Sequence, residues 1–267
     1  MGADIKQLRT RIKSVSSTLH LTRAMGLVAS SKIRKATHSM IRGNEYATAL
    51  EETVSLLTGF EECKKTPYMA KRQGGKHCLA VIAGDRGLAG GYNANIFRLC
   101  REYPSAEIIP IGKRACERFG KESVSAESFS FQNAKALADD ICSRFKNGEF
   151  QKFGIVCTKY HSMMSQEAYI RWLLPLPDAK QSERVGAVFE PDEVTVLNSM
   201  VPDYLAGMIL SSVKESFACE VAARRVAMDS AGKNAQEMID RLGLEYNRAR
   251  QGAITQEITE IVAGSSI

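Results

Sequence analysis

Proline is missing from long stretches at both ends of the chain. All seven prolines lie between Pro67 and Pro202. Because proline interrupts helices, its absence permits one unbroken helix before Pro67 and another after Pro202. The sequence also lacks any run of roughly 18 apolar residues of the kind that spans a bilayer. We therefore expect no direct insertion into a membrane.

Residues suited to catalysis or metal binding are few and scattered. The four histidines and seven cysteines occur singly, without the pairwise spacing of a zinc site. These absences predict buried free thiols, no metal site, no cofactor and no catalytic residue.

A glycine-rich loop covers residues 84–91, with the sequence Gly-Asp-Arg-Gly-Leu-Ala-Gly-Gly. It matches neither the phosphate-binding pattern GxxxxGK followed by Ser or Thr nor the dinucleotide pattern GxGxxG. We interpret it as a tight turn that presents Asp85 and Arg86 at the edge of a sheet, rather than as a nucleotide site.

The excess positive charge is confined to the first part of the chain. Residues 1–42 contain nine Lys or Arg and one acidic residue, a net charge of +8, while the whole chain carries +6. A segment of this kind favours an acidic partner, which could be nucleic acid, an anionic membrane surface or an acidic protein surface.

Apolar and small residues follow a heptad-like spacing in the N-terminal segment, which predicts a coiled-coil helix. The predicted seam consists of Ile5, Leu8, Ile12, Val15, Leu19, Thr22, Gly26, Ala29, Ile33, Ala36, Met40, Ala47, Leu50, Val54 and Leu57. The C-terminal segment carries shorter apolar stripes with shifts of register between them. A helix of about 60 residues is about 90 Å long, too long for a compact globule of this chain. We therefore expect residues 1–60 and 203–267 to pair as an antiparallel coiled coil.

The middle of the chain has a different pattern. Short apolar runs at 77–83, 106–111, 153–158 and 168–174 predict strands, and helical patterns lie near 93–102, 113–119 and 133–147. Strands that alternate with helices favour a mainly parallel sheet. The predicted fold class is α/β, with a Rossmann-like domain over residues 77–202 inserted between the two long helices.

Several motifs, in order along nearly the whole chain, resemble the gamma subunit of F-type ATP synthases. At the N-terminus these are residues 12–18 and 22–32, and in the middle the loop 84–91 and residues 173–177. The most specific similarity lies near the C-terminus, at residues 225–229, 246–251 and 254–262, the last reading Ile-Thr-Gln-Glu-Ile-Thr-Glu-Ile-Val. The sequence departs from the family pattern at His20-Leu21 and at Ala89.

The resemblance implies a central rotor shaft that performs no chemistry itself. In this family the helix pair stands inside a hexamer of three alpha and three beta subunits. The inserted domain rests on the membrane ring of c subunits beside the epsilon subunit. Proton or sodium flow turns the shaft, which drives ATP synthesis in the beta subunits, or hydrolysis in reverse. The expected place is the cytoplasmic face of the bacterial plasma membrane, where partner subunits hold the chain.

The resemblance also assigns roles to individual residues. It predicts a polar contact with a beta-subunit loop at Arg250, Gln251, Thr255 and Glu257. It places near an acidic lever of beta the residues Arg9, Arg23, Met25 and Lys32. It predicts an apolar tip that turns in a collar at Ile254, Ile258 and Ile261.

Two other functions remain open from the sequence. A basic coiled coil could bind nucleic acid through the charges of residues 1–42. Against this, Tyr46 is the first aromatic residue, so no aromatic side chain interleaves those charges. A Rossmann-like enzyme would need a nucleotide site, and the loop 84–91 lacks the residues for one.

Overall fold

The computed structural model describes residues 2–72, 74–178 and 189–264. By its internal contacts the chain forms two compact units, one of Ser31–Arg224 and one of Met1–Ser30 with Arg225–Ile267, and each is described by itself. Residues 179–188 and 265–267, which belong to the predicted segments 77–202 and 203–267, lie outside the described residues.

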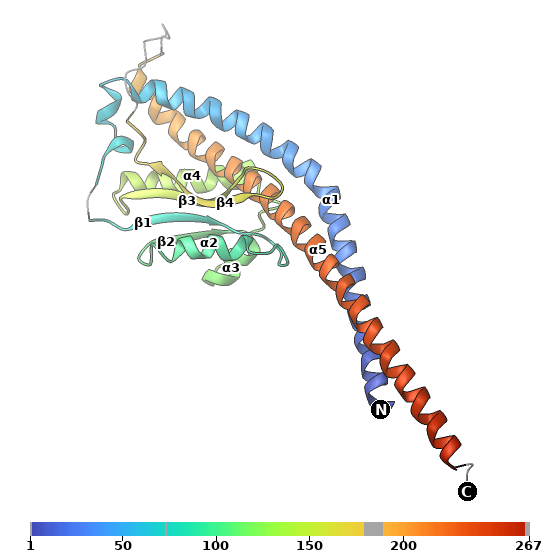
Figure 1. Cartoon of the computed structure of the whole chain (residues 1–267). Helices are drawn as coiled ribbons and strands as arrows, with labels where there is room; N and C mark the ends of the chain where they lie inside the picture. Colours follow the sequence, from blue (N-terminus) through green and yellow to red (C-terminus); the bar gives the residue numbers. More distant parts are fainter. Residues whose placement is uncertain (1, 73, 179–188, 265–267) are drawn as a thin grey trace. The chain divides into compact units, whose positions relative to one another are not determined.

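Two long helices contribute to both units (Figure 1). Helix α1 comprises Gly2–Thr58 and helix α5 comprises Glu193–Gly264. In the unit Ser31–Arg224 the Ser211 hydroxyl donates to Asn44 Oδ1 at 2.8 Å, and Gly207 lies against Leu50. In the other unit Gly26 lies beside Met228, and Thr22 lies beside Gly232. Within each unit rising numbers on α1 meet falling numbers on α5, so the helices are antiparallel, as predicted.

The predicted seam is the face that α1 turns inward. Every one of its residues is buried or half-buried. Small residues allow the helices to approach closely: a Cβ on Gly207 would lie 2.4 Å from Leu50 Cδ1. The heptad spacing therefore located the buried side of this helix correctly.

Helix α5 begins ten residues before the predicted boundary at residue 203, so its first turns include Pro202. Its start is fixed by Asp192, whose carboxylate accepts hydrogen bonds from Thr195 N at 2.8 Å and Thr195 Oγ1 at 2.7 Å. A proline inside a helix costs about 3 kcal/mol. Burial of Leu197 and Val201 in the core offsets this cost. The predicted division of the chain into functional domains stays a prediction.

The unit Ser31–Arg224 contains a four-stranded sheet with the order β2-β1-β3-β4. Its strands are β1 (His77–Ile82), β2 (Glu107–Ile111), β3 (Lys152–Tyr160) and β4 (Gln166–Leu174). Strands β2 and β3 pair with β1 in parallel, and β4 pairs with β3 antiparallel. The mainly parallel α/β fold predicted from the sequence is confirmed.

Helices cover both faces of the sheet (Figure 1). Helix α4 (Phe131–Lys146) lies on one face, and α2 (Tyr92–Cys100) and α3 (Lys113–Phe119) lie on the other. Alternate residues of β1 point to the two faces. Cys78 and Ala80 pack in the core shared with α4 and α5, while Leu79 and Val81 pack with α2. This double burial explains why β1 is a continuous apolar run.

Two short 3₁₀ helices, Cys63–Lys65 and Pro67–Met69, connect α1 to the sheet.

Gly112 lies between β2 and α3. It has a φ of 96°, and a Cβ at this position would lie 1.9 Å from the Ala83 carbonyl oxygen. Only glycine fits this contact.

Among the described helices, none has both the length and the apolar character that a membrane span requires.

The seven cysteines are free and buried, which predicts low thiol reactivity. Burial raises the pKa of Cys78 and Cys157 to about 12, and that of Cys63 and Cys100 to about 11. Since the thiolate is the reactive form, an aromatic disulfide reagent at pH 8 should modify the folded chain very slowly. After unfolding in urea all seven thiols should react at once. Rapid modification of any thiol before unfolding would contradict the described packing.

Candidate functional site

The C-terminal end of α5 presents the residues predicted to contact a beta loop. Arg250, Gln251, Thr255 and Glu257 are all exposed. The Thr255 hydroxyl donates to the Gln251 carbonyl oxygen at 2.9 Å within the helix. The side chains of Arg250 and Gln251 themselves make no ion pair or hydrogen bond in the part of the chain that the structure describes. Their donors and acceptors are thus available to a partner.

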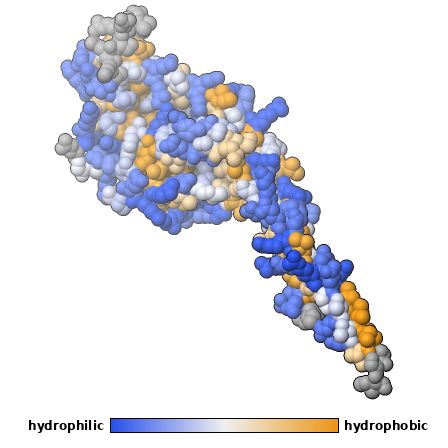
Figure 2. Space-filling model, viewed as in Figure 1, coloured by the Kyte–Doolittle hydropathy of each residue, from blue (hydrophilic) through white to orange (hydrophobic). Residues whose placement is uncertain are grey.

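Apolar side chains share this helix end. Ile254, Ile258 and Ile261 are 45%, 57% and 66% exposed, and Figure 2 shows apolar surface near the end of α5. Helical spacing aligns Arg250, Ile254, Glu257 and Ile261 along one ridge and Gln251, Thr255 and Ile258 along the next. Polar and apolar residues therefore lie on one common face. An exposed apolar face of this kind is typical of an interaction surface.

The four residues predicted to lie near an acidic lever are divided between the two units. Arg9, Arg23 and Met25 belong to the unit Met1–Ser30 with Arg225–Ile267. Arg9 and Arg23 are exposed and Met25 is half-buried. Lys32 belongs to the other unit, where its ammonium forms an ion pair with Glu127.

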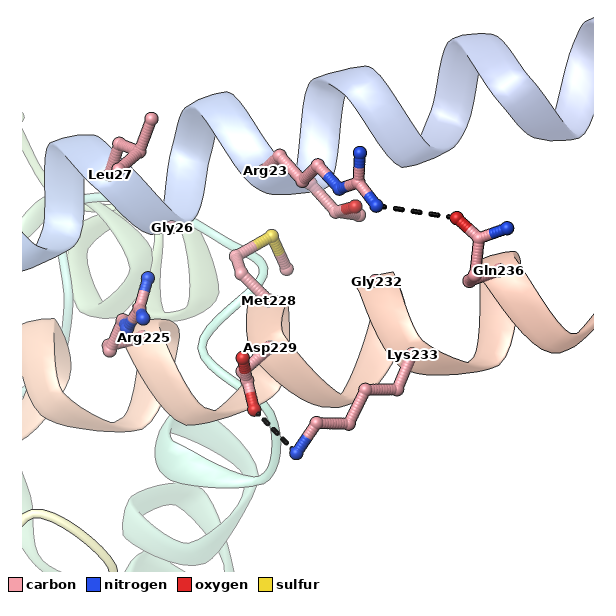
Figure 3. A pocket seen from close by; sticks show the side chains of 10 residues that line it. Arg23, Gly26, Leu27, Arg225, Met228, Asp229, Gly232, Lys233 and Gln236 are labelled. Carbon is pink, nitrogen blue, oxygen red and sulfur yellow. Dashed lines mark hydrogen bonds and ion pairs between the residues drawn. The ribbon is translucent and has the colours of Figure 1, made fainter.

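A groove of about 480 Å³ lies along the contact between α1 and α5 beside Arg23 (Figure 3). Gly26 and Gly232 leave its space open, because neither has a side chain to fill it. The Arg23 guanidinium donates to Gln236 Oε1 at 3.3 Å across the groove, and Lys233 pairs with Asp229 at 3.1 Å along α5. A groove with charged rims on an exposed helix pair is a second candidate contact surface.

The glycine-rich loop does not present Asp85 outward. The carboxylate of Asp85 accepts hydrogen bonds from Ser125 Oγ at 2.6 Å, from the backbone N–H groups of Ala126 and Glu127 at 2.9 Å each, and from Lys113 N at 3.0 Å. Burial alone would raise the pKa of Asp85, but these hydrogen bonds outweigh it and lower the pKa below its ordinary value. Asp85 is thus a structural acceptor that holds the segment before α4.

Arg86 does point outward, as predicted for the loop. Its side chain is 62% exposed, and its guanidinium lies 3.9 Å from Glu127. Glu127 therefore faces two cations, Arg86 and Lys32.

A buried ion pair on α5 holds the backbone of the loop. Glu220, with only 2% of its side chain exposed, pairs with Arg224 one turn later. Glu220 accepts from the N–H groups of Asp85 and Arg86 at 3.3 Å each. Arg224 donates to the carbonyl oxygens of Arg86 and Gly87 at 3.2 Å each. Gly84 is needed because a Cβ there would lie 2.7 Å from Glu220 Cδ.

The same side of α5 also bonds to the end of β3. Glu215 accepts from Tyr160 N at 3.0 Å, and Ser216 Oγ accepts from Thr158 N at 3.1 Å. The sequence reasoning missed this polar row. A glutamate and an arginine four residues apart in a segment of mostly small and apolar residues, at Glu220 and Arg224, could have indicated it.

Within the described ranges, no group of three or more His, Cys, Asp or Glu is placed to hold a metal ion. His77 packs against Tyr103 and Trp172 with ring centroids 5.5 and 5.4 Å apart, which is a packing role.

Comparison with known proteins gives a consistent result. A family model described as ATP synthase matches residues 4–266. The ATP synthase gamma chain of Ruminococcus albus is 38% identical over 281 residues, covering 98% of each chain. That of Moorella thermoacetica is 36% identical over 277 residues, again covering 98% of each chain. The sodium ion specific ATP synthase gamma chain of Acetobacterium woodii is 35% identical over 298 residues, covering 99% of each.

Solved structures with the same fold come from mitochondrial ATP synthases. A chain in the rotor of the Euglena gracilis enzyme has a TM-score of 0.67 and 18% identity, covering 95% of this chain and 100% of that chain. A chain in the OSCP/F1/c-ring part of the Euglena enzyme has a TM-score of 0.69 and 20% identity, covering 100% of this chain and 95% of that chain. At these identities the likeness concerns the fold.

Arg224→Ala should destabilise the unit Ser31–Arg224 by about 3 to 5 kcal/mol, because Glu220 would remain buried without its cation. Urea unfolding followed by circular dichroism measures the change. The matched control is Arg225→Ala, which removes the neighbouring half-buried arginine and should cost less than about 1 kcal/mol. An equal loss of unfolding free energy in the two variants would mean that the buried ion pair does not stabilise the unit more than the half-buried Arg225 does.

Asp85→Asn should lower the stability at pH 7 by about 2 to 3 kcal/mol, because an amide cannot accept all the hydrogen bonds that the carboxylate accepts. The folded-state pKa of Asp85 is lowered, so its contribution is present above the unfolded-state pKa of about 3.9 and is lost as the pH falls through the folded-state value. The difference between the two proteins should therefore narrow below about pH 4. The control Asp139→Asn removes an exposed carboxylate of the same unit. If the difference in unfolding free energy between the original chain and the Asp85→Asn variant did not change with pH, the ionised carboxylate of Asp85 would not be the cause of that difference.

Proposed function

Because the chain belongs to the family of ATP synthase gamma chains, we propose that it is the central rotor shaft in the catalytic head of an F-type ATP synthase. The observation that carries the proposal is the extent of the match, which runs over residues 4–266 and over 98% of both chains for the Ruminococcus albus relative. The chain is not itself an enzyme: ATP is made or hydrolysed in the beta subunits. The comparisons favour this function over a nucleic-acid-binding coiled coil.

The paired helices α1 and α5 suit a shaft mechanically. A helix alone bends, whereas two antiparallel helices with a shared buried seam brace each other. The sequences of the two helices differ all the way along, so the shaft presents a different surface to each of the three beta subunits around it. Rotation thereby shifts each beta subunit in turn among its conformations, which is a change of population driven by differential contact.

The contact with a beta loop is proposed at Arg250 and Gln251, with Thr255 and Glu257 one to two turns later. A guanidinium and an amide form directional hydrogen bonds that break and form again at each step. Their exposure in the described chain supports this role. Ile254, Ile258 and Ile261 are proposed to turn in an apolar collar, where few polar contacts have to break.

The acidic lever of beta is proposed to face Arg9, Arg23 and Met25 on α1; of these, Arg23 lines the groove of Figure 3. Lys32 and Arg86 would take part in such a contact only by exchanging their shared partner Glu127 for a carboxylate of beta. Asp85 is proposed to hold the loop in shape through its hydrogen bonds to the segment before α4.

The inserted α/β domain is proposed to rest on the ring of c subunits beside epsilon. The proton or sodium flow that turns the ring then turns this domain and the shaft together. The proposed location is the cytoplasmic face of a bacterial plasma membrane, where the chain is held through its partner subunits.

Co-purification with the cognate alpha and beta subunits, followed by an ATPase assay with and without the chain, tests the proposal. We expect one stable complex whose sustained turnover requires the chain, and no hydrolysis by the chain alone. Failure to join alpha and beta, or turnover that does not depend on the chain, would refute the rotor assignment.

The double change Arg250→Ala with Gln251→Ala should lower the turnover of this complex several-fold, because the polar contact with beta is lost. The control is Arg248→Ala, which removes an exposed arginine from the same helix end and should leave turnover unchanged. An equal loss in the control would show that general positive charge, rather than this contact, matters.

A further inference from the structure

A cavity of about 410 Å³ lies within the unit Ser31–Arg224, where α1, α5 and the segment before α4 meet. Its lining shares no residue with the groove of Figure 3 and does not include the helix end at Arg250. Its lining combines an apolar wall with three lysines, Glu127 and two serines. Small-molecule sites in proteins have this size and this combination of apolar lining with a few placed polar groups.

The apolar wall is fixed by the core behind it. Val213 and Ala36 are 1% and 5% exposed. Phe217 packs against the buried cluster of Ala36, Met40 and Ala218. Phe129, from the segment before α4, packs against the main core. The wall is therefore already formed in the chain without a ligand.

The lysines leave the cavity with unbalanced positive charge. Lys32 is paired with Glu127, which Arg86 also approaches. Lys35 and Lys214 line the cavity as well, and no carboxylate within the described ranges lies at ion-pair distance from either. The aliphatic stem of Lys214 runs along α1, with Cδ 3.3 Å from where a Cβ of Gly43 would lie. Its ammonium is thus held near the cavity.

We propose that this cavity binds a small organic anion with an apolar body, such as a carboxylate that carries a short alkyl or aromatic group. The carboxylate would lie between Lys35 and Lys214, and the apolar body against Phe129 and Phe217. A small inorganic anion would leave the apolar wall exposed to water, and a neutral apolar molecule would leave the two ammonium groups without an anionic partner. A ligand with both a carboxylate and an apolar body satisfies both parts of the lining. The bound molecule would touch α1, α5 and the segment before α4 at once, so it would hold these three elements together.

Titration of the purified full chain with octanoate, followed by calorimetry, tests the proposal independently of the rotor function. Octanoate should bind saturably at one site per chain. Octanol, which keeps the apolar body, and inorganic phosphate, which keeps only charge, should each bind at least about tenfold more weakly. Equal binding of phosphate, equal binding of octanol, or no saturable binding of octanoate would each overturn the proposal.

A pair of charge-matched variants locates the site. Lys35→Gln with Lys214→Gln should weaken octanoate binding by about tenfold, because both ammonium partners of the carboxylate are removed. Lys6→Gln with Lys13→Gln removes two exposed charges elsewhere on α1 and should leave binding unchanged. Circular dichroism checks that both variants are folded. An equal loss of octanoate affinity in the two double variants would show that octanoate is held by general electrostatic attraction and not in this cavity.

Discussion

The buried pair of Glu220 and Arg224 is the interaction on which the geometry of the unit Ser31–Arg224 depends. Charges removed from water are stable only where hydrogen bonds compensate for the lost hydration. Here the backbone of residues 85–87 provides that compensation, so the loop is shaped to fit α5. Asp85 then continues the network to the segment before α4. A single chain of polar contacts thus joins the long helix, the end of β1 and the start of α4.

This network suits a chain that must transmit force between a domain and a helix. Apolar surfaces can slide over each other with little change in energy, because dispersion and hydrophobic contacts are not directional. Hydrogen bonds are directional, and they are lost within a small displacement. The polar row from Glu215 to Arg224 therefore fixes the register of α5 against the ends of β1 and β3. The seam between α1 and α5, in contrast, is mostly apolar and small, which provides length and stiffness without many fixed points.

Periodic features of the fold could be predicted from the sequence, and single polar residues could not. The heptad spacing identified the buried face from Leu19 to Leu57, and the apolar runs located all four strands. Pro202 suggested a helix boundary, but burial of Leu197 and Val201 outweighs the local preference of proline. Asp85 looked like a displayed carboxylate because no local signal reveals donors 28 to 42 residues away. The site residues near Arg250 were predicted from the family resemblance. Exposed residues that contact a partner do not produce a periodic pattern in the sequence, so periodicity could not identify them.

The exposed face from Arg250 to Ile261 has a consequence for how such a motor can change over generations. These side chains contribute almost nothing to the internal packing of the chain, so substitutions here carry little penalty in folding. The proposed contact with beta and the proposed apolar tip can therefore change one residue at a time while the fold remains intact. Residues such as Gly84 and Gly112 have no such freedom, because a single methyl group would collide with Glu220 or with Ala83. The molecule thus separates the part that selection can adjust from the part that it must preserve.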